Sequence, residues 1–288
     1  MWLFSRGSSR EVSRVTLSTG KISRRLRWVF ESLTWPLMAS YYRARFAKCR
    51  PLDVSIGVTT YMNRFDSCLK PLLPKLCTLF PNEQVIVIAN GHYLEGEQQV
   101  YISRFYGLCS RFPGAESEAY ADPRGLSSLW NRIIERSTSD NILILNDDIM
   151  ITAGFRHFID ELLKGHAPVS TINGSWSHFL IRKATLEKVG IFDEGFSEIG
   201  GEDDDYLARM AIAGLRSELV TTDTISGRSK RRMRVSGLNS YGKDMSKETG
   251  GYSTLNTEYL QRKWETADEF FEGAVEVRGR KTRYWKLR

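Results

Sequence analysis

Four consecutive carboxylates, at 202–205, lie in the second half of the chain. They follow two glycines, in the sequence GGEDDDYLARMAIAG, and lead into an apolar pattern typical of a helix. Like charges packed this closely repel one another and resist burial, and both effects raise carboxylate pKa values. A carboxylate with a raised pKa is suited to accept a proton near neutral pH. The run is therefore a candidate for general-base chemistry, while Asp204 and Asp205 are expected in the first helical turn, where negative charge favours the helix dipole.

A second polar group, Asn146, Asp147 and Asp148, comes directly after the apolar run ILIL. Carboxylates at the end of a buried strand are costly unless they are hydrogen-bonded or paired with a cation. Mg²⁺ prefers one or two carboxylates together with phosphate oxygens. The triplet indicates either a divalent-metal site or a strand-to-loop turn in which Asn and Asp make local hydrogen bonds.

Strands and helices alternate in the part of the chain that must position these acids. Strands are predicted at 54–60, 85–91 and 141–151, and helices at 67–79, 95–106 and 121–137. This alternation predicts parallel βαβ units, and hence an α/β fold with a mostly parallel sheet flanked by helices. Ligands of such sheets bind beyond the carboxyl ends of the strands. The polar stretches TTYMNR, ANGH and NDD all follow strand ends, so we expect them to converge on one site.

The composition is that of a globular protein with an uneven charge distribution. Of the 288 residues, 41% are hydrophobic and 26% are charged, and the net charge is +7. Residues 1–50 hold eleven Lys or Arg against two acids, whereas the remainder holds 30 basic and 32 acidic residues. A near-neutral body with a basic arm argues against nucleic acid as the main ligand of the fold, although the arm alone suits polyanions.

Several features favour the cytoplasm as the location of the protein. No apolar run approaches the roughly 20 residues that span a bilayer, and the N-terminus lacks the apolar core and cleavage site of a secretory signal. The four cysteines show no CxxC pairing or disulfide framework, which favours reduced thiols. The four histidines show no metal-ligand spacing.

The basic arm contains a helical pattern that starts at Lys21. Apolar residues recur at helical spacing from Ile22 to Leu33, with arginines on the other faces, until Pro36 interrupts the pattern. A second helical piece is predicted over 37–46. Two interpretations stay open: a helix packed on the main domain, or an amphipathic segment that lies on an anionic membrane surface.

The segment 190–214 carries the most specific motif in the chain. Its members are Gly190, Phe192, Asp193, Glu194 and Phe196, then Glu202, Asp203, Asp205, Tyr206, Arg209 and Gly214. This order resembles the G-x-F-D-E-x-F and E-D-x-D-Y-x-x-R motifs of inverting glycosyltransferases of the GT-A fold, the family 2 type. VSIGVTTYMNR, ANGH, GLSSLWNRII and NDD are similar to that family's first strand and donor loop, second strand end, following helix and acidic triplet. The resemblance runs over roughly residues 52–265.

The resemblance implies a Rossmann-like GT-A domain that moves a sugar from a nucleotide-sugar donor to an acceptor with inversion. It implies that Asp203 is the base that deprotonates the acceptor hydroxyl, and that Glu202 orients this base or binds acceptor hydroxyls. A Mn²⁺ or Mg²⁺ ion held by Asp148, with Asp147 nearby, would neutralise the charge on the diphosphate leaving group. The donor-binding residues expected on this basis are Thr59, Tyr61, Asn90, Arg124, Asn146 and Asp147.

Two positions depart from the family pattern. Asn146 stands where the family carries the first acid of its triplet, which predicts a lower metal affinity. Ala89 and Asn90 stand where an acid often contacts the nucleobase, although a UDP-sugar remains the expected donor. The acceptor is expected to be a saccharide or a lipid-linked acceptor, in surface polysaccharide or glycan biosynthesis. Because QRKW lacks the Q-x-x-R-W spacing of processive synthases, we expect single sugar additions.

Three parts of the chain are expected. They are a basic N-terminal arm at 1–50, a GT-A domain at 51–265 and a basic-aromatic tail at 266–288. The stretch 225–253 is long, polar and rich in Gly and Ser, and long loops in compact domains are often functional. Arg228, Lys230 and Arg231 are predicted to close over the donor diphosphate as a lid, and a solvated basic loop is the alternative. A cytoplasmic enzyme, peripheral on the inner face of the membrane through its arm, is the location these parts suggest.

Two other classes of protein fit parts of the sequence. A catalytically silent GT-A domain, which binds saccharides or acts as a scaffold, fits Asn146 and Ala89 but not the intact pair Glu202 and Asp203. A polyanion-binding protein would use 1–50 and 228–234, with a steep salt dependence. An acid-cluster nuclease would leave the 190–214 motif unexplained.

Overall fold

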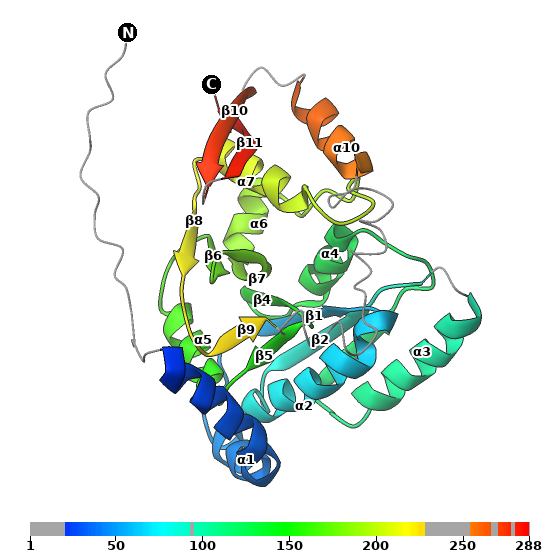
Figure 1. Ribbon diagram of the computed structural model, residues 1–288, viewed down its shortest axis with the longest axis vertical. Coiled ribbons are helices and arrows are strands. Elements are labelled where there is room, and N and C mark those ends of the chain that lie inside the picture. The colour runs from blue at the N-terminus through cyan, green and yellow to red at the C-terminus, as the bar shows by residue number, and fades with distance from the viewer. Residues whose placement is uncertain (1–20, 93–94, 228–253, 266–269, 278–279, 288) are drawn as a thin grey trace.

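The central feature of the fold is a seven-stranded sheet with the order β3-β2-β1-β4-β7-β6-β8 (Figure 1). The computed structural model describes residues 21–92, 95–227, 254–265, 270–277 and 280–287. The strands of the sheet are β1 (Ser55–Thr60), β2 (Gln84–Ala89), β3 (Ala115–Ala119), β4 (Asn141–Asn146), β6 (Val169–Ile172), β7 (Ser175–Arg182) and β8 (Ser217–Val220). The helices are α1 (Lys21–Ala47), α2 (Lys70–Leu79), α3 (Glu95–Cys109), α4 (Leu126–Arg136), α5 (Phe155–Leu163), α6 (Lys183–Val189), α7 (Glu202–Ile212) and α10 (Thr254–Glu265).

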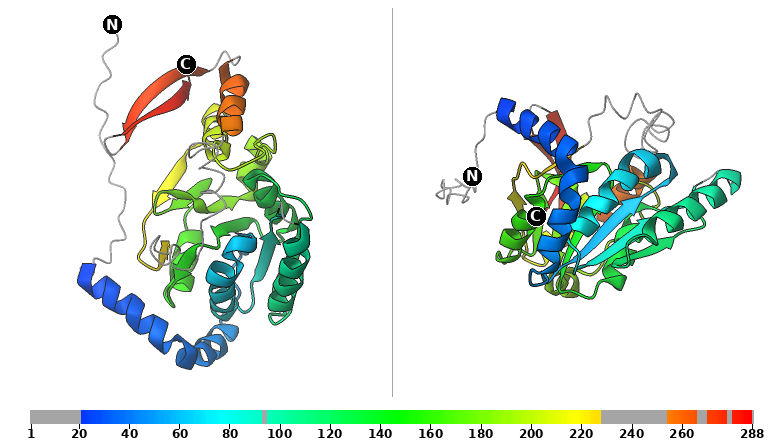
Figure 2. Two further views of the ribbon diagram at one scale, coloured as in Figure 1. Left: turned by 45° about the vertical axis from the view of Figure 1, so that its right-hand side comes forward. Right: turned by 90° about the horizontal axis from the view of Figure 1, so that it is seen from below.

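The strand directions confirm the predicted fold class. β3, β2, β1 and β4 run parallel to one another, and β6 and β8 are also parallel. β7 is antiparallel to both of its neighbours, β4 and β6. Helices flank the sheet on both sides (Figures 1 and 2). The chain is thus an α/β protein with a mostly parallel sheet, and the predicted strand ends of β1, β2 and β4 are neighbours.

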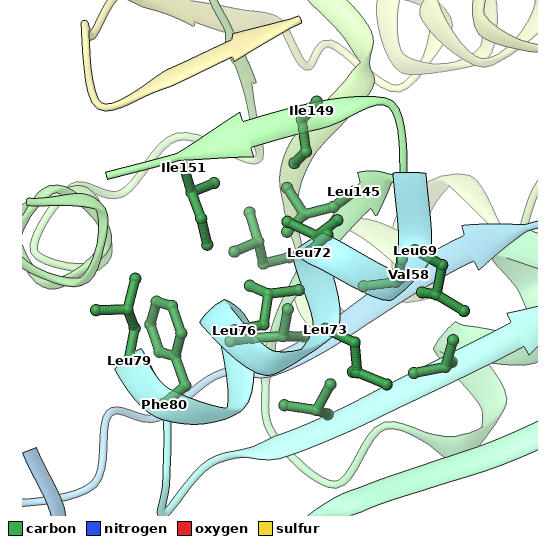
Figure 3. Packing of buried hydrophobic residues seen from close by; sticks show 14 of the residues in the cluster. Val58, Leu69, Leu72, Leu73, Leu76, Leu79, Phe80, Leu145, Ile149 and Ile151 are labelled. Carbon is green, nitrogen blue, oxygen red and sulfur yellow. The ribbon is translucent and has the colours of Figure 1, made fainter. Parts of the chain in front are cut away.

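Alternate residues of the central strands pack into two separate cores. Val58, Val87 and Leu145 belong to the core beneath α2, which also contains Leu72, Leu76 and Phe80 (Figure 3). Ile86, Ile88, Ile142 and Ile144 point to the opposite face and pack against α4, α6 and α7. This alternation follows from the two-residue period of a strand, and burial on both faces explains the continuous apolar runs of the sequence.

Gly57 shows how closely one helix approaches the sheet. A β-carbon at this position would lie 2.1 Å from the side chain of Ile133, on α4. Only a glycine leaves room for this approach, because any other residue would push α4 away from β1. The close packing fixes the position of α4, whose N-terminus lies at the candidate site.

Helix α1 differs from its prediction, because it continues through Pro36 instead of ending there. The proline ring removes one backbone hydrogen bond, but contacts on both sides of it hold the helix against the body. Trp35 and Phe46 pack against the core beneath α2, and Lys75 of α2 lies over the Trp35 ring, 4.7 Å from its centroid. Part of α1 therefore packs on the domain, in agreement with one of the two interpretations of the arm.

The predicted strand at 141–151 is in fact two strands. β4 ends at Asn146, Asp147 and Asp148 form the turn, and β5 (Ile149–Ile151) pairs with β9 (Ile225–Gly227) in a separate sheet. The apolar residues after the turn pack against the same core, which is why their composition is that of a continuing strand. The acids therefore occupy a turn between two strands instead of the interior of one.

Three further elements differ from the sequence-based expectation. β3 forms the edge of the sheet although its residues, AESEA, lack a β-rich pattern. The helix predicted at 67–79 begins with a 3₁₀ turn at Met62–Arg64 and a π turn at Phe65–Leu69 before α2. The sequence predicts that YLQRKWETADEFF packs back as a helix, but α10 ends at Glu265 and an antiparallel hairpin of β10 (Phe270–Val277) and β11 (Arg280–Leu287) follows. Among the described residues, no helix is long and apolar enough to cross a membrane.

Candidate active site

The ends of β1 and β4 bring the predicted polar residues together. Thr59 lies opposite Asn146 in the parallel register, and its hydroxyl donates a hydrogen bond to Asn146 Oδ1 at 3.0 Å. The Thr60 hydroxyl donates to Asp147 Oδ2 at 2.6 Å. The convergence follows from the topology, since carboxyl ends of parallel strands meet at one edge of the sheet.

Arg64 is the cation of this group, and the sequence analysis did not single it out. Its Nη1 lies 3.2 Å from Asp147 Oδ1 and 3.4 Å from Asp148 Oδ2. Burial raises the pKa of Asp147 to about 6, and the charge of Arg64 opposes that rise. Its guanidinium also lies 5.1 Å from the centre of the Tyr61 ring. The sequence signal that could have identified Arg64 is its place four residues after the end of one predicted strand, since two acids follow the end of another.

The donor atoms at the β4 turn fit a weakly bound divalent cation. Asp147 is 1% exposed and both of its oxygens are engaged by Thr60 and Arg64. The Asp148 side chain is 30% exposed, so its carboxylate is the accessible one. One accessible carboxylate is enough when phosphate oxygens complete the coordination. Asp148 is therefore the residue that would hold such an ion, and the ion would supply Lewis-acid stabilisation of phosphate charge.

Asn90 and Arg124, two predicted donor contacts, are bonded to each other. The Asn90 amide donates to the backbone oxygen of Arg124 at 2.9 Å and accepts from its backbone N–H at 2.8 Å. Asn90 is buried, so its side chain holds the segment before α4 against the end of β2. The Arg124 guanidinium lies over the ring of Tyr120, 5.6 Å from its centre.

The N-terminal end of α4 joins the strand ends to the 190–214 motif. A β-carbon on Gly125 would lie 2.0 Å from the backbone oxygen of Phe196, so this glycine permits the close approach of the two segments. Asn131 donates to the backbone oxygen of Phe192 at 2.8 Å and to Glu194 Oε1 at 2.9 Å. Asn131 also accepts from the backbone N–H of Phe192 at 2.9 Å. The asparagine of the GLSSLWNRII segment thus holds the FDE motif.

Two glycines with positive φ angles lead into the acidic run. Gly200 has φ 108° and Gly201 has φ 90°, a region that favours glycine. The turn they form aims the backbone N–H of Gly200 at Glu202 Oε2, at 2.6 Å. Glu202 is buried, and its burial, together with the charge of Asp203, raises its pKa to about 8.

Asp203 and Asp204 follow in the first turn of α7. Burial raises the pKa of Asp203, although hydrogen bonds from its own backbone and that of Asp204 oppose the rise. Burial and the charge of Asp203 also raise the pKa of Asp204, but its side chain is exposed and solvent screens the effect. Among the described residues, no Lys, Arg or His makes an ion pair with any of the acids at 202–204.

Asp205 has a different role from its neighbours. It is fully buried and accepts from Arg209 Nε at 2.9 Å, from Trp264 Nε1 at 3.1 Å and from Lys263 Nζ at 2.6 Å. It lies in the first turn of α7, as predicted, but as the centre of a buried ion-pair group instead of a solvated residue at a helix start. Lys263 and Trp264 lie far away in the sequence, so local patterns could not reveal this pairing.

A cavity of about 840 Å³ lies between α1 and α5, away from these groups. Tyr42, Arg45, Arg50 and His157 are among its lining residues, and none of the predicted site residues lines it. On its α5 side, ligand atoms of His157, Asp160 and Glu161 lie within 4.8 Å of one another. The candidate active site is the region of the strand ends and α7, because the carboxylates with raised pKa values lie there. The predicted lid residues Arg228, Lys230 and Arg231 lie outside the described residues.

No known protein family and no curated protein sequence matches the chain. Among solved structures, it is similar to a glucosyl-3-phosphoglycerate synthase from Mycobacterium tuberculosis in complex with Mn²⁺ and UDP, with 13% identity, a TM-score of 0.48 and coverage of 86% of this chain and 91% of that one. It is also similar to a mannosyl-3-phosphoglycerate synthase from Rubrobacter xylanophilus, with 8% identity, a TM-score of 0.48 and coverage of 86% and 90%. A mannosyltransferase from Pyrobaculum calidifontis in complex with GDP-Man and Mn²⁺ has 11% identity, a TM-score of 0.44 and coverage of 83% and 79%.

Proposed function

We propose that this protein is a metal-dependent inverting glycosyltransferase of the GT-A fold, similar to family 2. The observation that carries the proposal is the state of the acids at 202–204: they have raised pKa values and no ion-paired cation among the described residues. Inversion requires a base on the side of the sugar opposite the leaving group. Carboxylates held in this state, at the end of the sheet where ligands bind, support that chemistry.

Asp203 is the proposed base. It is partly exposed, whereas Glu202 is buried with an oxygen bonded to Gly200. In the reaction, the Asp203 carboxylate takes the proton of an acceptor hydroxyl. The oxygen of that hydroxyl forms a bond to the anomeric carbon of the sugar, while the bond from the anomeric carbon to the nucleoside diphosphate breaks. Glu202 fixes the start of α7 through its hydrogen bond from the backbone N–H of Gly200, and burial raises the pKa of Asp203, which makes Asp203 a stronger base.

The donor would bind at the ends of β1, β2 and β4. Thr59, Tyr61 and Asn146 would contact the nucleoside of the donor. Asp148, with Mn²⁺ or Mg²⁺, would contact its diphosphate. UDP is the proposed nucleotide. Arg64 could offer a further positive charge to phosphate, because its guanidinium already lies beside Asp148. Asn90 and the backbone of Arg124 would shape this site through their mutual hydrogen bonds rather than by direct contact.

The proposal extends to the acceptor, the domain limits and the basic stretch that follows Gly227. The acceptor would be a saccharide or a glycolipid in surface polysaccharide or glycan synthesis, with one sugar added per encounter. The GT-A domain would run from 51 to 265, between the basic arm and the tail. The basic stretch after Gly227 would close over the donor diphosphate as a lid.

A peripheral membrane location is supported by the outward face of α1. Phe30, Leu33, Leu37 and Tyr41 recur at helical spacing and are all more than half exposed, on the side away from Trp35 and Phe46. Co-sedimentation of the full chain with anionic vesicles tests the location, with the Leu33→Ser and Leu37→Ser double variant as comparison. Equal pelleting of both proteins would remove α1 as the contact.

The first test of the function is a thermal-shift panel of nucleoside diphosphates, each with Mn²⁺ and with EDTA. A ligand that binds only the native state raises Tm by mass action. We expect a shift for UDP that is lost with EDTA and in Asp148→Ala, but retained in Asp203→Asn, which should lose sugar transfer. A shift that is indifferent to EDTA would remove the metal from the proposal.

The second candidate is a silent GT-A domain that binds saccharides, and the engagement of Asp147 by Arg64 favours it. It predicts saccharide binding without nucleotide binding in the same panel. A polyanion-binding protein would show neither and would bind heparin with a steep salt dependence.

A further inference from the structure

Helix α10 contacts the acidic segment from outside the sheet. In Figure 1, α10 lies beside the loop that leads into α7, away from β1 and β2. Asn256, Tyr259, Lys263 and Trp264, at helical spacing along it, all bond to residues between 193 and 205. Of these four side chains, only that of Trp264 is both hydrophobic and buried. The helix is thus attached mainly by polar contacts to the segment that carries the proposed base.

Asn256 makes the contact closest to the proposed base. Its side chain is 1% exposed. Its amide donates to the backbone oxygen of Gly200 at 2.9 Å, and its Oδ1 accepts from the backbone N–H of Glu198 at 3.3 Å. One side chain therefore bridges both ends of the turn before Gly201.

Gly200 connects Asn256 to the acids. Its carbonyl accepts from Asn256 while its N–H donates to Glu202 Oε2 at 2.6 Å. Gly200 and Gly201 both have positive φ, and because glycine populates other backbone conformations as readily, contacts from outside the turn must select this one. Asn256 holds the Gly200 carbonyl on one side and the Glu198 N–H on the other, so it restrains the backbone of Gly200, whose own N–H holds Glu202. Asp203 is the next residue after Glu202.

The other end of α10 adds an ionic attachment. Lys263 Nζ lies 2.5 Å from Asp193 Oδ2 and 2.6 Å from Asp205 Oδ1, and thereby joins the FDE motif to α7. Tyr259 also donates to Asp193 Oδ2 at 2.9 Å, and its ring packs edge-on against Phe196. The two ends of α10 thus hold the acidic segment on both sides of Gly200 and Gly201.

We propose that Asn256 is a positioning residue for the pair Glu202 and Asp203, and that α10 acts as the support that fixes these acids for catalysis. The inference rests on the proposed function for its catalytic part. Its structural part, that α10 orders the turn before α7, does not depend on what reaction the protein performs.

The test compares Asn256→Ala with Glu258→Ala, an exposed residue on the same helix. In the full chain, hydrogen–deuterium exchange of peptides that span 196–206 should be faster in Asn256→Ala, while peptides of β1 and β4 exchange as in the wild type. We expect kcat to fall by about 10- to 100-fold, because small displacements of reacting groups have effects of that size, with the KM for the donor and UDP binding unchanged. Glu258→Ala should match the wild type in every measurement.

A second pair of variants guards against general unfolding. Lys263→Met removes the ionic attachment, and Arg262→Met removes an exposed charge one residue away. We expect faster exchange over 193–206 in the first variant and no change in the second.

Two results would overturn the inference. One is exchange over 196–206 in Asn256→Ala that equals the Glu258→Ala control. The other is a loss of activity that appears in KM and UDP binding instead of kcat. If the wild type transfers no sugar from any donor, the proposed function fails, and the exchange data alone decide whether α10 orders the turn.

Discussion

The two acidic groups of the molecule, at 146–148 and at 202–205, differ in how their charge is compensated. At the end of β4, a single guanidinium, that of Arg64, touches both Asp147 and Asp148. At the start of α7, the cations converge on Asp205 alone, and the acids at 202–204 have no ion-paired cation among the described residues.

The comparison separates carboxylates that are paired with a cation from carboxylates that have no such partner among the described residues. Asp147 and Asp205 are the two most buried of these acids, and each is paired with a cation. Burial without such a partner disfavours the charged form, and that is the state of Glu202. Burial alone therefore does not single out the proposed base, since Asp147 and Asp205 are buried and paired, and the lack of a paired cation in the described part of the chain is what distinguishes the acids at 202–204.

The largest expected effect is on catalysis by Asp203. Asp203→Asn should lower kcat by about 10²- to 10⁴-fold, the range for loss of a general base, because the amide cannot take up the acceptor proton. Release of UDP from the donor, with transfer to acceptor, measures the rate. Asp204→Asn is the matched control and should change kcat little; equal losses in both variants would assign the base role to the pair instead of Asp203.

The next effect is on stability at Asp205. Asp205→Ala should lower the free energy of unfolding by about 3–5 kcal/mol, because it leaves the cations around a buried ion pair uncompensated. Urea unfolding followed by fluorescence measures the change. If the variant were as stable as the wild type, Asp205 would not differ from its neighbours in the way proposed.

Stability should also depend on pH through Glu202. Its pKa is about 8 in the folded protein and about 4.3 in an unfolded chain, so the native state binds more protons between these values. The free energy of unfolding therefore falls as the pH rises from about 5 to about 8. In Glu202→Gln the group no longer titrates, so the slope over this window should become shallower. An unchanged slope would show that Glu202 is charged at neutral pH.

The smallest effect is expected at an exposed pair outside both groups. Asp66 pairs with Arg104, and both side chains are at least half exposed. Asp66→Ala should cost about 0–1 kcal/mol, as is usual for exposed ion pairs, in the same urea experiment as Asp205→Ala. A cost as large as that of Asp205→Ala would mean that burial does not set the difference.

Local sequence patterns were sufficient to predict an element where the spacing of its apolar residues matches the side chains that are buried. The strands β1, β2 and β4 and the helix α4 were predicted from apolar runs and helical spacing, because their side chains pack directly on the core. β3, with its acidic residues, had no such pattern and was missed. The continuation of α1 through Pro36 was missed because packing on α2 overrides the local effect of a proline.

The sequence by itself determined that the strands run parallel, and with it the expectation that the polar residues after their ends, among them Thr59, Asn146 and Asp148, lie at one edge of the sheet. It also placed the four acids at the start of a helix, since glycines and helical periodicity are local signals. Only the tertiary structure decided which acids are paired with a cation, because Arg64 reaches Asp147 across 83 residues of chain and Lys263 reaches Asp193 across 70. Charge compensation depends on the distance between charged groups in the folded protein, and the order of residues along the chain does not contain that distance.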